Sequence, residues 1–170
     1  MKLEAYIRDI PDFPKKGIIF KDITTLLKDK DAFAAALRAL ADKYKDQKID
    51  SVLAVEARGF IFGGAIAEKL GTGFVPVRKK GKLPAKTQSI TYSLEYGTDT
   101  LEIHEDAIKP GDKILIIDDL LATGGTSKAV CDLVKQLKGE VAGIAFLIEL
   151  EFLKGRDKLK GYPISSLIKY

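Results

Sequence analysis

The sequence has very little cysteine and no long apolar run. Its single cysteine, Cys131, has no second thiol in the chain with which to form a disulfide. No hydrophobic stretch approaches the roughly 20 residues that a helix needs to cross a bilayer. The first residues, MKLEAYIRDIPDFP, also lack the continuous apolar segment of a secretory signal. We therefore expect a cytoplasmic protein with no membrane partner.

Two common nucleotide-binding motifs are absent as well. No GxGxxG opens the first strand–helix unit, and the glycine-containing stretch Thr123–Thr126 lacks the Lys-Ser/Thr ending of a Walker loop. The net charge of +4, from 28 basic and 24 acidic residues, is too small to predict nucleic-acid binding, although it would suit small polyanions. Dinucleotide binding and ATP hydrolysis are therefore poor hypotheses.

Apolar segments with the patterns of strands and helices alternate along the chain. Its 170 residues, 46% hydrophobic and 31% charged, suit one domain spanning residues 1–170. Helices are expected over residues 3–10, 31–46 and 59–71, strands from 51 and over 73–77 and 140–150, and a strand–loop–helix unit over 113–139. Solid apolar strands alternating with helices predict an α/β fold whose parallel sheet is covered on both faces.

Ligands of such sheets gather beyond the carboxyl ends of the strands. Two unusual turns, Glu56–Gly59 and Asp118–Thr126, follow strands there, so we expect them to line one cleft. Between them, residues 78–104 carry a basic cluster, a Tyr96-Gly97 turn signal and alternating flanks. This pattern predicts a projecting two-stranded flap that could exclude water from the cleft.

The stretch ILIIDDLLATGGT suggests what the cleft binds. Glycines at the start of a helix let the unpaired N–H groups approach an anion, and Thr123 and Thr126 add hydroxyl donors. Asp118 and Asp119 are costly to bury side by side and could accept hydrogen bonds from vicinal sugar hydroxyls. A ribose 5-phosphate group would span both features. The alternative is that the acids only cap the loop and the glycine stretch is an ordinary N-cap.

The same stretch resembles the phosphoribosyl pyrophosphate (PRPP) signature of the type I phosphoribosyltransferases. The resemblance implies a phosphoribosyltransferase-like α/β fold with a small N-terminal hood (residues 1–28) and a β-flap (78–104). It also implies that the two acids meet the ribose hydroxyls and that the following loop holds the 5-phosphate. The implied PRPP-binding and AMP-binding residues are Arg58, Asp118, Asp119, Ala122, Thr123, Gly124, Gly125 and Thr126.

The turn VEARGF is the expected pyrophosphate site. Arg58 offers a guanidinium fork beside free N–H groups at a helix start, although it could instead pair with a surface acid. The family often has a cis peptide in this turn, and we expect one next to Ala57-Arg58. In the adenine branch of the family a basic loop also reaches the pyrophosphate, and its arginine comes across a dimer interface. This implies that Arg78 and Lys82 bind pyrophosphate, that Arg78 reaches across the interface, and that the protein is a homodimer. Without the resemblance, the basic run would be a solvated loop.

The segment FPKKGIIFKDIT resembles the base-recognition segment of the adenine branch. Phe20 could stack on a planar base while the backbone of Ile19 and Lys21 reads its polar edge, and Leu150 would pack on the other side. The alternative is that Phe20 belongs to the core. Lys21 stands where many relatives have Arg, a departure of little consequence if the backbone does the reading.

On the flap, Glu95 matches the acid/base residue of the family, and Tyr96 is expected to pack over the substrate. Taken alone, Glu95 would be an exposed hairpin carboxylate. The resemblance implies Mg²⁺ held through PRPP and water, with no metal bound directly by the protein. It assigns no chemistry to His104 or Cys131.

The complete prediction is an enzyme of purine salvage that transfers the 5-phosphoribosyl group from PRPP to adenine, giving AMP and pyrophosphate. The hood, arginine turn, flap and PRPP loop occur in the expected order along nearly the whole chain. Two alternatives remain: a phosphoribosyltransferase for another base, and a PRPP-binding regulator without catalysis. Such a regulator would usually carry a DNA-binding segment, for which we see no room before Phe13.

Overall fold

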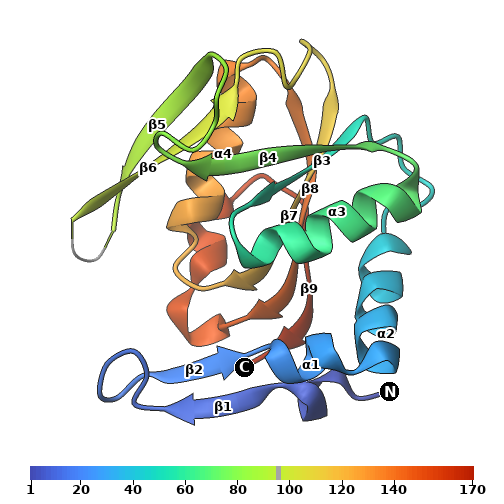
Figure 1. The fold of residues 1–170 in the computed structure, drawn as a ribbon, viewed down its shortest axis with the longest axis vertical. Helices are drawn as coiled ribbons and strands as arrows, with labels where there is room; N and C mark the ends of the chain where they lie inside the picture. Colours follow the sequence, from blue (N-terminus) through green and yellow to red (C-terminus); the bar gives the residue numbers. More distant parts are fainter. Residues whose placement is uncertain (95–96) are drawn as a thin grey trace. The chain divides into compact units, whose positions relative to one another are not determined.

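The computed structural model describes residues 1–94 and 97–170 and divides into two compact units, residues 1–39 and 40–170 (Figure 1). No helix among these residues is both long and apolar enough to span a membrane. The elements of the first unit are the 3₁₀ helix η1 (Leu3–Tyr6), strands β1 (Arg8–Pro11) and β2 (Ile19–Asp22), and helices α1 (Thr24–Lys28) and α2 (Lys30–Ala41), the last of which leads into the second unit.

The first unit corrects the prediction of a helix over residues 3–10. Only η1 is helical there, and it is a single 3₁₀ turn. Strand β1 pairs antiparallel with β2, and Arg8 forms an ion pair with Asp22 at 2.6 Å across the hairpin. Because hydrogen bonds from β2 satisfy the backbone of residues 8–11, strand pairing prevails over the local helical spacing. The helix expected over residues 31–46 forms as α2 but ends at Ala41.

The second unit is built on a seven-stranded sheet in the order β5-β6-β4-β3-β7-β8-β9. Strands β4, β3, β7, β8 and β9 are parallel, as predicted, while β6 runs antiparallel to β4 and β5 antiparallel to β6. The strands are β3 (Ser51–Val55), β4 (Gly73–Lys79), β5 (Thr87–Ser93), β6 (Thr98–His104), β7 (Lys113–Leu121), β8 (Glu140–Glu149) and β9 (Ile164–Lys169). The predicted flap is therefore a two-stranded extension of the sheet edge.

Helices cover both faces of this sheet. Helix α4 (Gly125–Gln136) contributes to a buried cluster with alternate residues of the central strands, including Leu53 and Ile116. Helix α3 (Arg58–Leu70) lies on the opposite face, where Gly63 approaches the Ala54 side chain. The chain leaves β3 toward β4 on one side and leaves β7 toward β8 on the other. The carboxyl ends of β3 and β7 therefore form the switch point at which such sheets bind ligands.

Three short elements after residue 150 were not expected from the sequence. Two are 3₁₀ helices, η2 (Glu151–Leu153) and η3 (Gly155–Leu159), and the third is the edge strand β9, which pairs parallel with β8. The strand expected over residues 73–77 continues to Lys79, where it meets β6. Strand β9 completes the sheet at the edge beyond β8.

Candidate functional site

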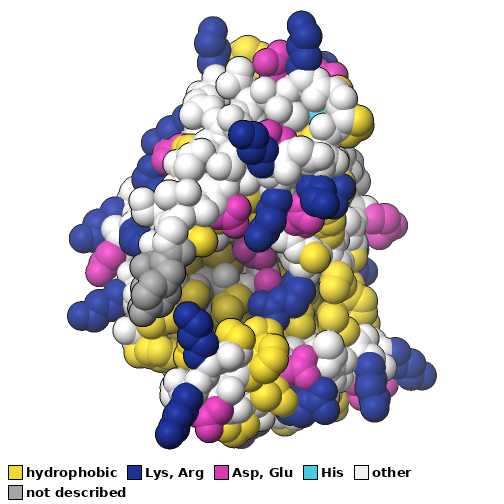
Figure 2. Space-filling model, turned by 60° about the vertical axis from the view of Figure 1, so that its left-hand side comes forward, with side chains coloured by type: hydrophobic (Ala, Val, Ile, Leu, Met, Phe, Trp, Pro, Cys, Tyr) yellow, Lys and Arg dark blue, Asp and Glu magenta, His cyan; other side chains and the backbone are white. Residues whose placement is uncertain are grey.

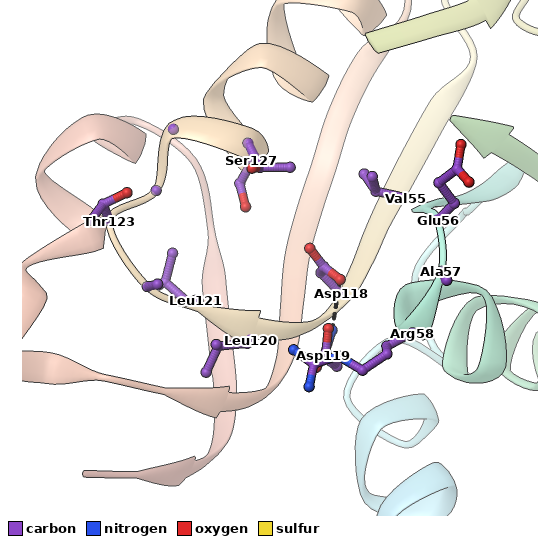
Figure 3. A pocket seen from close by; sticks show the side chains of 14 residues that line it. Val55, Glu56, Ala57, Arg58, Asp118, Asp119, Leu120, Leu121, Thr123 and Ser127 are labelled. Atoms are coloured by element: carbon purple, nitrogen blue, oxygen red, sulfur yellow. Dashed lines mark hydrogen bonds and ion pairs between the residues drawn. The ribbon is translucent and has the colours of Figure 1, made fainter. Parts of the chain in front are cut away.

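A pocket of about 510 Å³ lies at the carboxyl ends of β3 and β7. Figure 2 shows acidic and basic side chains close together on the face that is turned toward the viewer. The residues that line the pocket, most of them labelled in Figure 3, are Val55, Glu56, Ala57, Arg58, Asp118, Asp119, Leu120, Leu121, Ala122, Thr123, Gly124, Gly125, Thr126 and Ser127. The two turns singled out in the sequence therefore line one cleft, as predicted.

Asp118 and Asp119 lie within β7, which continues to Leu121. The backbone N–H of Asp119 donates to Asp118 Oδ1 at 2.9 Å. Burial, followed by the neighbouring Asp119 charge, raises the pKa of Asp118 well above its usual value, and burial also raises the pKa of Asp119. The pair therefore ionises less readily than ordinary carboxyls, and hydrogen-bond donors such as sugar hydroxyls would favour its charged form.

Arg58 supplies a cation to this pair. Its guanidinium nitrogen lies 2.9 Å from Asp119 Oδ2, and Asp119 is almost fully buried (Figure 3). The Arg58 charge lowers the pKa of both acids and partly offsets their burial. Arg58 thus pairs with a pocket carboxylate and remains at the pocket wall, where an anion could compete for it.

The turn that carries Arg58 approaches β7 closely. A Cβ atom at Gly59 would lie 2.9 Å from Asp118 Oδ1, so a side chain there would displace the carboxylate. The Glu56–Ala57 peptide bond is cis, in the turn where the resemblance predicted a cis bond. The absence of a side chain at Gly59 therefore leaves room for the Asp118 carboxylate. The sequence analysis named Gly59 only as part of the turn.

The loop after β7 presents backbone amides to the pocket. Gly124 has φ +79° and is the N-cap of α4, and no side chain caps this helix start. The first N–H groups of α4, at Gly125, Thr126 and Ser127, therefore point out of the helix without intrahelical acceptors. This geometry, together with the Thr123 hydroxyl among the lining groups, is that of an anion cradle.

Two residues near the cradle were missed by the sequence analysis. Ser127 lines the pocket and is 5% exposed. The Tyr92 hydroxyl, on β5, lies 3.1 Å from Thr126 Oγ1 and links the flap to the loop. The alternation along β5 could have indicated this, because Ile90 and Tyr92 both pack against the buried cluster.

Arg78 and Lys82 do not line the pocket but lie next to it. The Arg78 guanidinium is 3.3 Å from the pocket residue Glu56, whose other carboxylate oxygen accepts a 2.7 Å hydrogen bond from the Lys79 N–H. Burial would raise the pKa of Glu56, but these two hydrogen bonds bring it below its usual value. Arg78 also donates to the Lys82 carbonyl at 3.4 Å, so both predicted pyrophosphate residues belong to one corner beside Glu56.

The predicted base-binding residues fall in different parts of the chain. Ile19, Phe20 and Lys21 lie on β2 of the first unit, where the Phe20 ring packs edge-on against Phe13 at 5.2 Å between ring centroids. Phe20 is only partly buried and Ile19 is 56% exposed, so neither is a core residue of that hairpin. In the second unit the Leu150 N–H donates to the Leu121 carbonyl at 2.9 Å, which places Leu150 beside a pocket-lining residue.

The predictions for Glu95, Tyr96 and a metal ion concern groups that the structure does not place in the pocket. Glu95 and Tyr96 lie outside the described residues. Among the residues that are described, no three His, Cys, Asp or Glu side chains gather in a way that could hold a metal ion.

Comparison with known proteins agrees with this geometry. Residues 23–165 match the model of the phosphoribosyl transferase domain. The chain is 60% identical to the adenine phosphoribosyltransferase of Halothermothrix orenii over 99% of both chains. The crystal structure of the adenine phosphoribosyltransferase from Thermoanaerobacter pseudethanolicus superimposes with a TM-score of 0.97 at 58% identity, covering 99% of this chain and 98% of that one.

The yeast adenine phosphoribosyltransferase is more distant, at 41% identity and a TM-score of 0.91 over 96% of this chain and 94% of that one. Its crystal structure contains adenine and an imino-altritol bisphosphate. The matches extend over almost the whole chain, including the arginine turn, the paired acids and the loop after β7. The chain belongs to the phosphoribosyltransferase family.

Proposed function

We propose that this protein transfers the 5-phosphoribosyl group of PRPP to N9 of adenine, giving AMP and pyrophosphate. The observation that carries the proposal is one pocket in which the partly buried Asp118 and the buried Asp119 lie between an anion cradle and Arg58. That arrangement suits a sugar with a phosphate at one end and a pyrophosphate at the other. Whole-chain identity to proteins named adenine phosphoribosyltransferase supports adenine as the base.

In this reaction the adenine N9 forms a bond to C1 of the sugar as the bond from C1 to the pyrophosphate oxygen breaks. Pyrophosphate leaves with the bonding electron pair, and adenine must lose one proton. The loop amides and Thr hydroxyls would hold the 5-phosphate, and Asp118 and Asp119 would accept hydrogen bonds from the ribose hydroxyls. Arg58 would exchange its Asp119 contact for the pyrophosphate, where it stabilises the developing negative charge.

Magnesium is proposed to arrive bound to PRPP, because this ion keeps several waters and does not require a dedicated protein cage. When bound, it would offset charge on the leaving pyrophosphate. A cytoplasmic location, a homodimer in which Arg78 reaches the neighbouring site, and pyrophosphate binding by Lys82 also stay predictions.

The assignment is tested by the choice of base. Purified protein would be incubated with Mg²⁺, PRPP and adenine, hypoxanthine or guanine, and pyrophosphate release measured. Adenine should be the preferred substrate, because a fixed backbone carbonyl facing position 6 accepts from its amino group but leaves a 6-oxo group unpaired, a difference of about 1–3 kcal/mol or more. No pyrophosphate with adenine would refute the proposal. Release only with another purine would identify a different phosphoribosyltransferase, and PRPP binding without turnover a regulator.

Glu95 is proposed as the group that manages the N9 proton, by its match to the family motif. Glu95→Gln keeps the size of the side chain but removes the base, so turnover should fall by roughly two or more orders of magnitude. AMP affinity should change by far less, since the charge is needed mainly during transfer. Steady-state kinetics and calorimetry with AMP provide the two measurements, and equal losses in both would exclude the proposed role.

Tyr92 offers a milder test of the cradle. Tyr92→Phe removes the hydroxyl next to Thr126 Oγ1 and keeps the ring packed. A neutral hydrogen bond contributes about 0.5–1.5 kcal/mol, so the KM for PRPP should rise roughly two- to tenfold with little change in kcat. Thr91→Val, which removes an exposed hydroxyl pair with Thr100 on the same hairpin, should leave the KM unchanged. An unchanged KM in the Tyr92 variant would show that this contact does not assist PRPP binding.

A further inference from the structure

The anion cradle is backed by main chain from a distant part of the sequence. A Cβ atom added at Gly124 would overlap the Gly155 carbonyl oxygen, and one added at Gly155 would overlap the Ala122 carbonyl oxygen. The Cβ atom added at Gly155 would also lie only 2.8 Å from Leu121 Cδ1. The loop and the start of η3 therefore touch backbone to backbone, which neither segment could do with a side chain at these glycines.

The residue after Gly155, Arg156, is anchored by an ion pair to the buried Glu149, although the Arg156 side chain itself is 41% exposed. Arg156 Nε and one terminal nitrogen donate to the two Glu149 carboxylate oxygens at 2.6 and 2.7 Å, and Ser166 Oγ donates to Glu149 at 2.6 Å. Glu149 is 3% exposed. These three hydrogen bonds come from residues 156 and 166, and the proposed reaction does not use the carboxylate itself.

The anchor lies on the strand next to the loop. Glu149 ends β8, where its register partner on β7 is Leu121, the last residue before the loop. Lys154, which precedes Gly155, has φ +52°, so the chain turns sharply between η2 and η3 before it reaches the contact. The Arg156–Glu149 contact therefore ties the residue after Gly155 to the end of β8, next to the end of β7.

We propose that Arg156 is a positioning residue for 5-phosphate binding. Its ion pair with Glu149, which Ser166 also hydrogen-bonds, keeps the Gly155 backbone in contact with the loop and so fixes the direction of the loop amides. The inference rests on the proposed function for the identity of the anion. Its physical basis is that an amide cradle binds an anion well only when its N–H groups are already aligned. Figure 3 shows the loop that would be aligned, at Thr123 and before Ser127.

The test compares variants of the Glu149 network with an exposed ion pair from the same segment. Arg156→Gln breaks the network, Ser166→Ala removes one hydrogen bond, and Arg156→Lys keeps the charge without the two-pronged contact. The control is Lys160→Gln, which removes an exposed pair with Asp157 just beyond η3. Hydrogen exchange of the amides of residues 122–126 would be measured without ligand, and ribose 5-phosphate and pyrophosphate binding by calorimetry.

In Arg156→Gln, loop amide exchange should accelerate and ribose 5-phosphate affinity should fall about tenfold or more, the scale of a hydrogen bond to a charged group. Pyrophosphate affinity should change less than twofold. Ser166→Ala and Arg156→Lys should show smaller effects in the same direction, and Lys160→Gln none. If Arg156→Gln fails to fold, the two milder variants decide.

Two outcomes would overturn the proposal: unchanged loop exchange in the network variants, or equal loss of both ligands, which would indicate a general loss of structure. If the unaltered protein binds no ribose 5-phosphate, the proposed function fails, and the exchange comparison alone still decides whether Arg156 positions the loop.

Discussion

Gly124→Ala is expected to lower kcat/KM for PRPP by at least about a hundredfold, which corresponds to roughly 2.7 kcal/mol of lost transition-state stabilisation. A left-handed conformation costs a residue with a side chain about 1–2 kcal/mol, and Gly124 has φ +79°. The new methyl group would also overlap the Gly155 carbonyl oxygen, with the Gly155 carbonyl carbon only 3.1 Å away. The loop must move to relieve the overlap, and its amides then leave their positions at the start of α4.

The matched control is Gly111→Ala. Gly111 has φ +87°, but a Cβ atom there would meet nothing within 4 Å. This variant should lose stability through backbone strain alone and keep its PRPP kinetics. Binding of ribose 5-phosphate, followed by calorimetry, separates the two effects. Wild-type affinity in the folded Gly124 variant would mean that the loop does not hold the phosphate.

Asp118→Asn is expected to lower activity and to stabilise the ligand-free protein. The amide keeps the oxygen that accepts from the Asp119 N–H but removes a charge that is buried beside another carboxylate. Loss of charge-assisted hydrogen bonds of about 1.5–3 kcal/mol to the ribose should reduce kcat/KM by roughly ten- to a hundredfold. The gain in stability follows from removing a group whose ionised form is disfavoured by folding.

The stability difference should depend on pH. An unfolded Asp has a pKa of about 3.9, and burial raises the pKa of Asp118 in the folded protein. Folding therefore favours the protonated carboxyl, and wild-type stability falls as pH rises from the unfolded value through the raised value. The advantage of Asp118→Asn should be small in acid and should grow to a plateau above that window.

Thermal unfolding of both proteins across this pH range measures the effect, and each kcal/mol gained raises Tm by about 2–4 °C for a chain of this size. The control is Asp106→Asn at an exposed position, which should give no such trend. Equal Tm values for wild type and Asp118→Asn at every pH would show that the buried carboxyl does not cost stability.

The paired acids and the following loop could be predicted because their signal is local. In β7 and α4, a buried strand, two carboxylates, a glycine turn and a helix follow one another within residues 113–136, so the order along the chain is also the order in space. The parallel sheet was predictable for the same reason, since each strand–helix unit carries its own apolar pattern.

Elements that depend on a distant partner were not predictable. Residues 8–10 belong to a stretch with helical spacing, yet they pair with residues 20–22 in a hairpin. Likewise, β9 is a strand that pairs with the distant β8. The Tyr92–Thr126 contact joins residues 34 positions apart, and nothing near Gly155 in the sequence indicates that its backbone meets the loop. These contacts depend on how the chain brings distant segments together beside the pocket, which a local sequence pattern does not show.

A crystal structure of the protein with AMP would test whether one sugar phosphate lies across the carboxyl edge of the sheet. We predict that the phosphate accepts hydrogen bonds from the amides of the loop ending at Thr126, and that the ribose hydroxyls donate to Asp118 and Asp119. Nucleotide bound elsewhere, with this pocket filled only by solvent, would contradict the proposed binding mode.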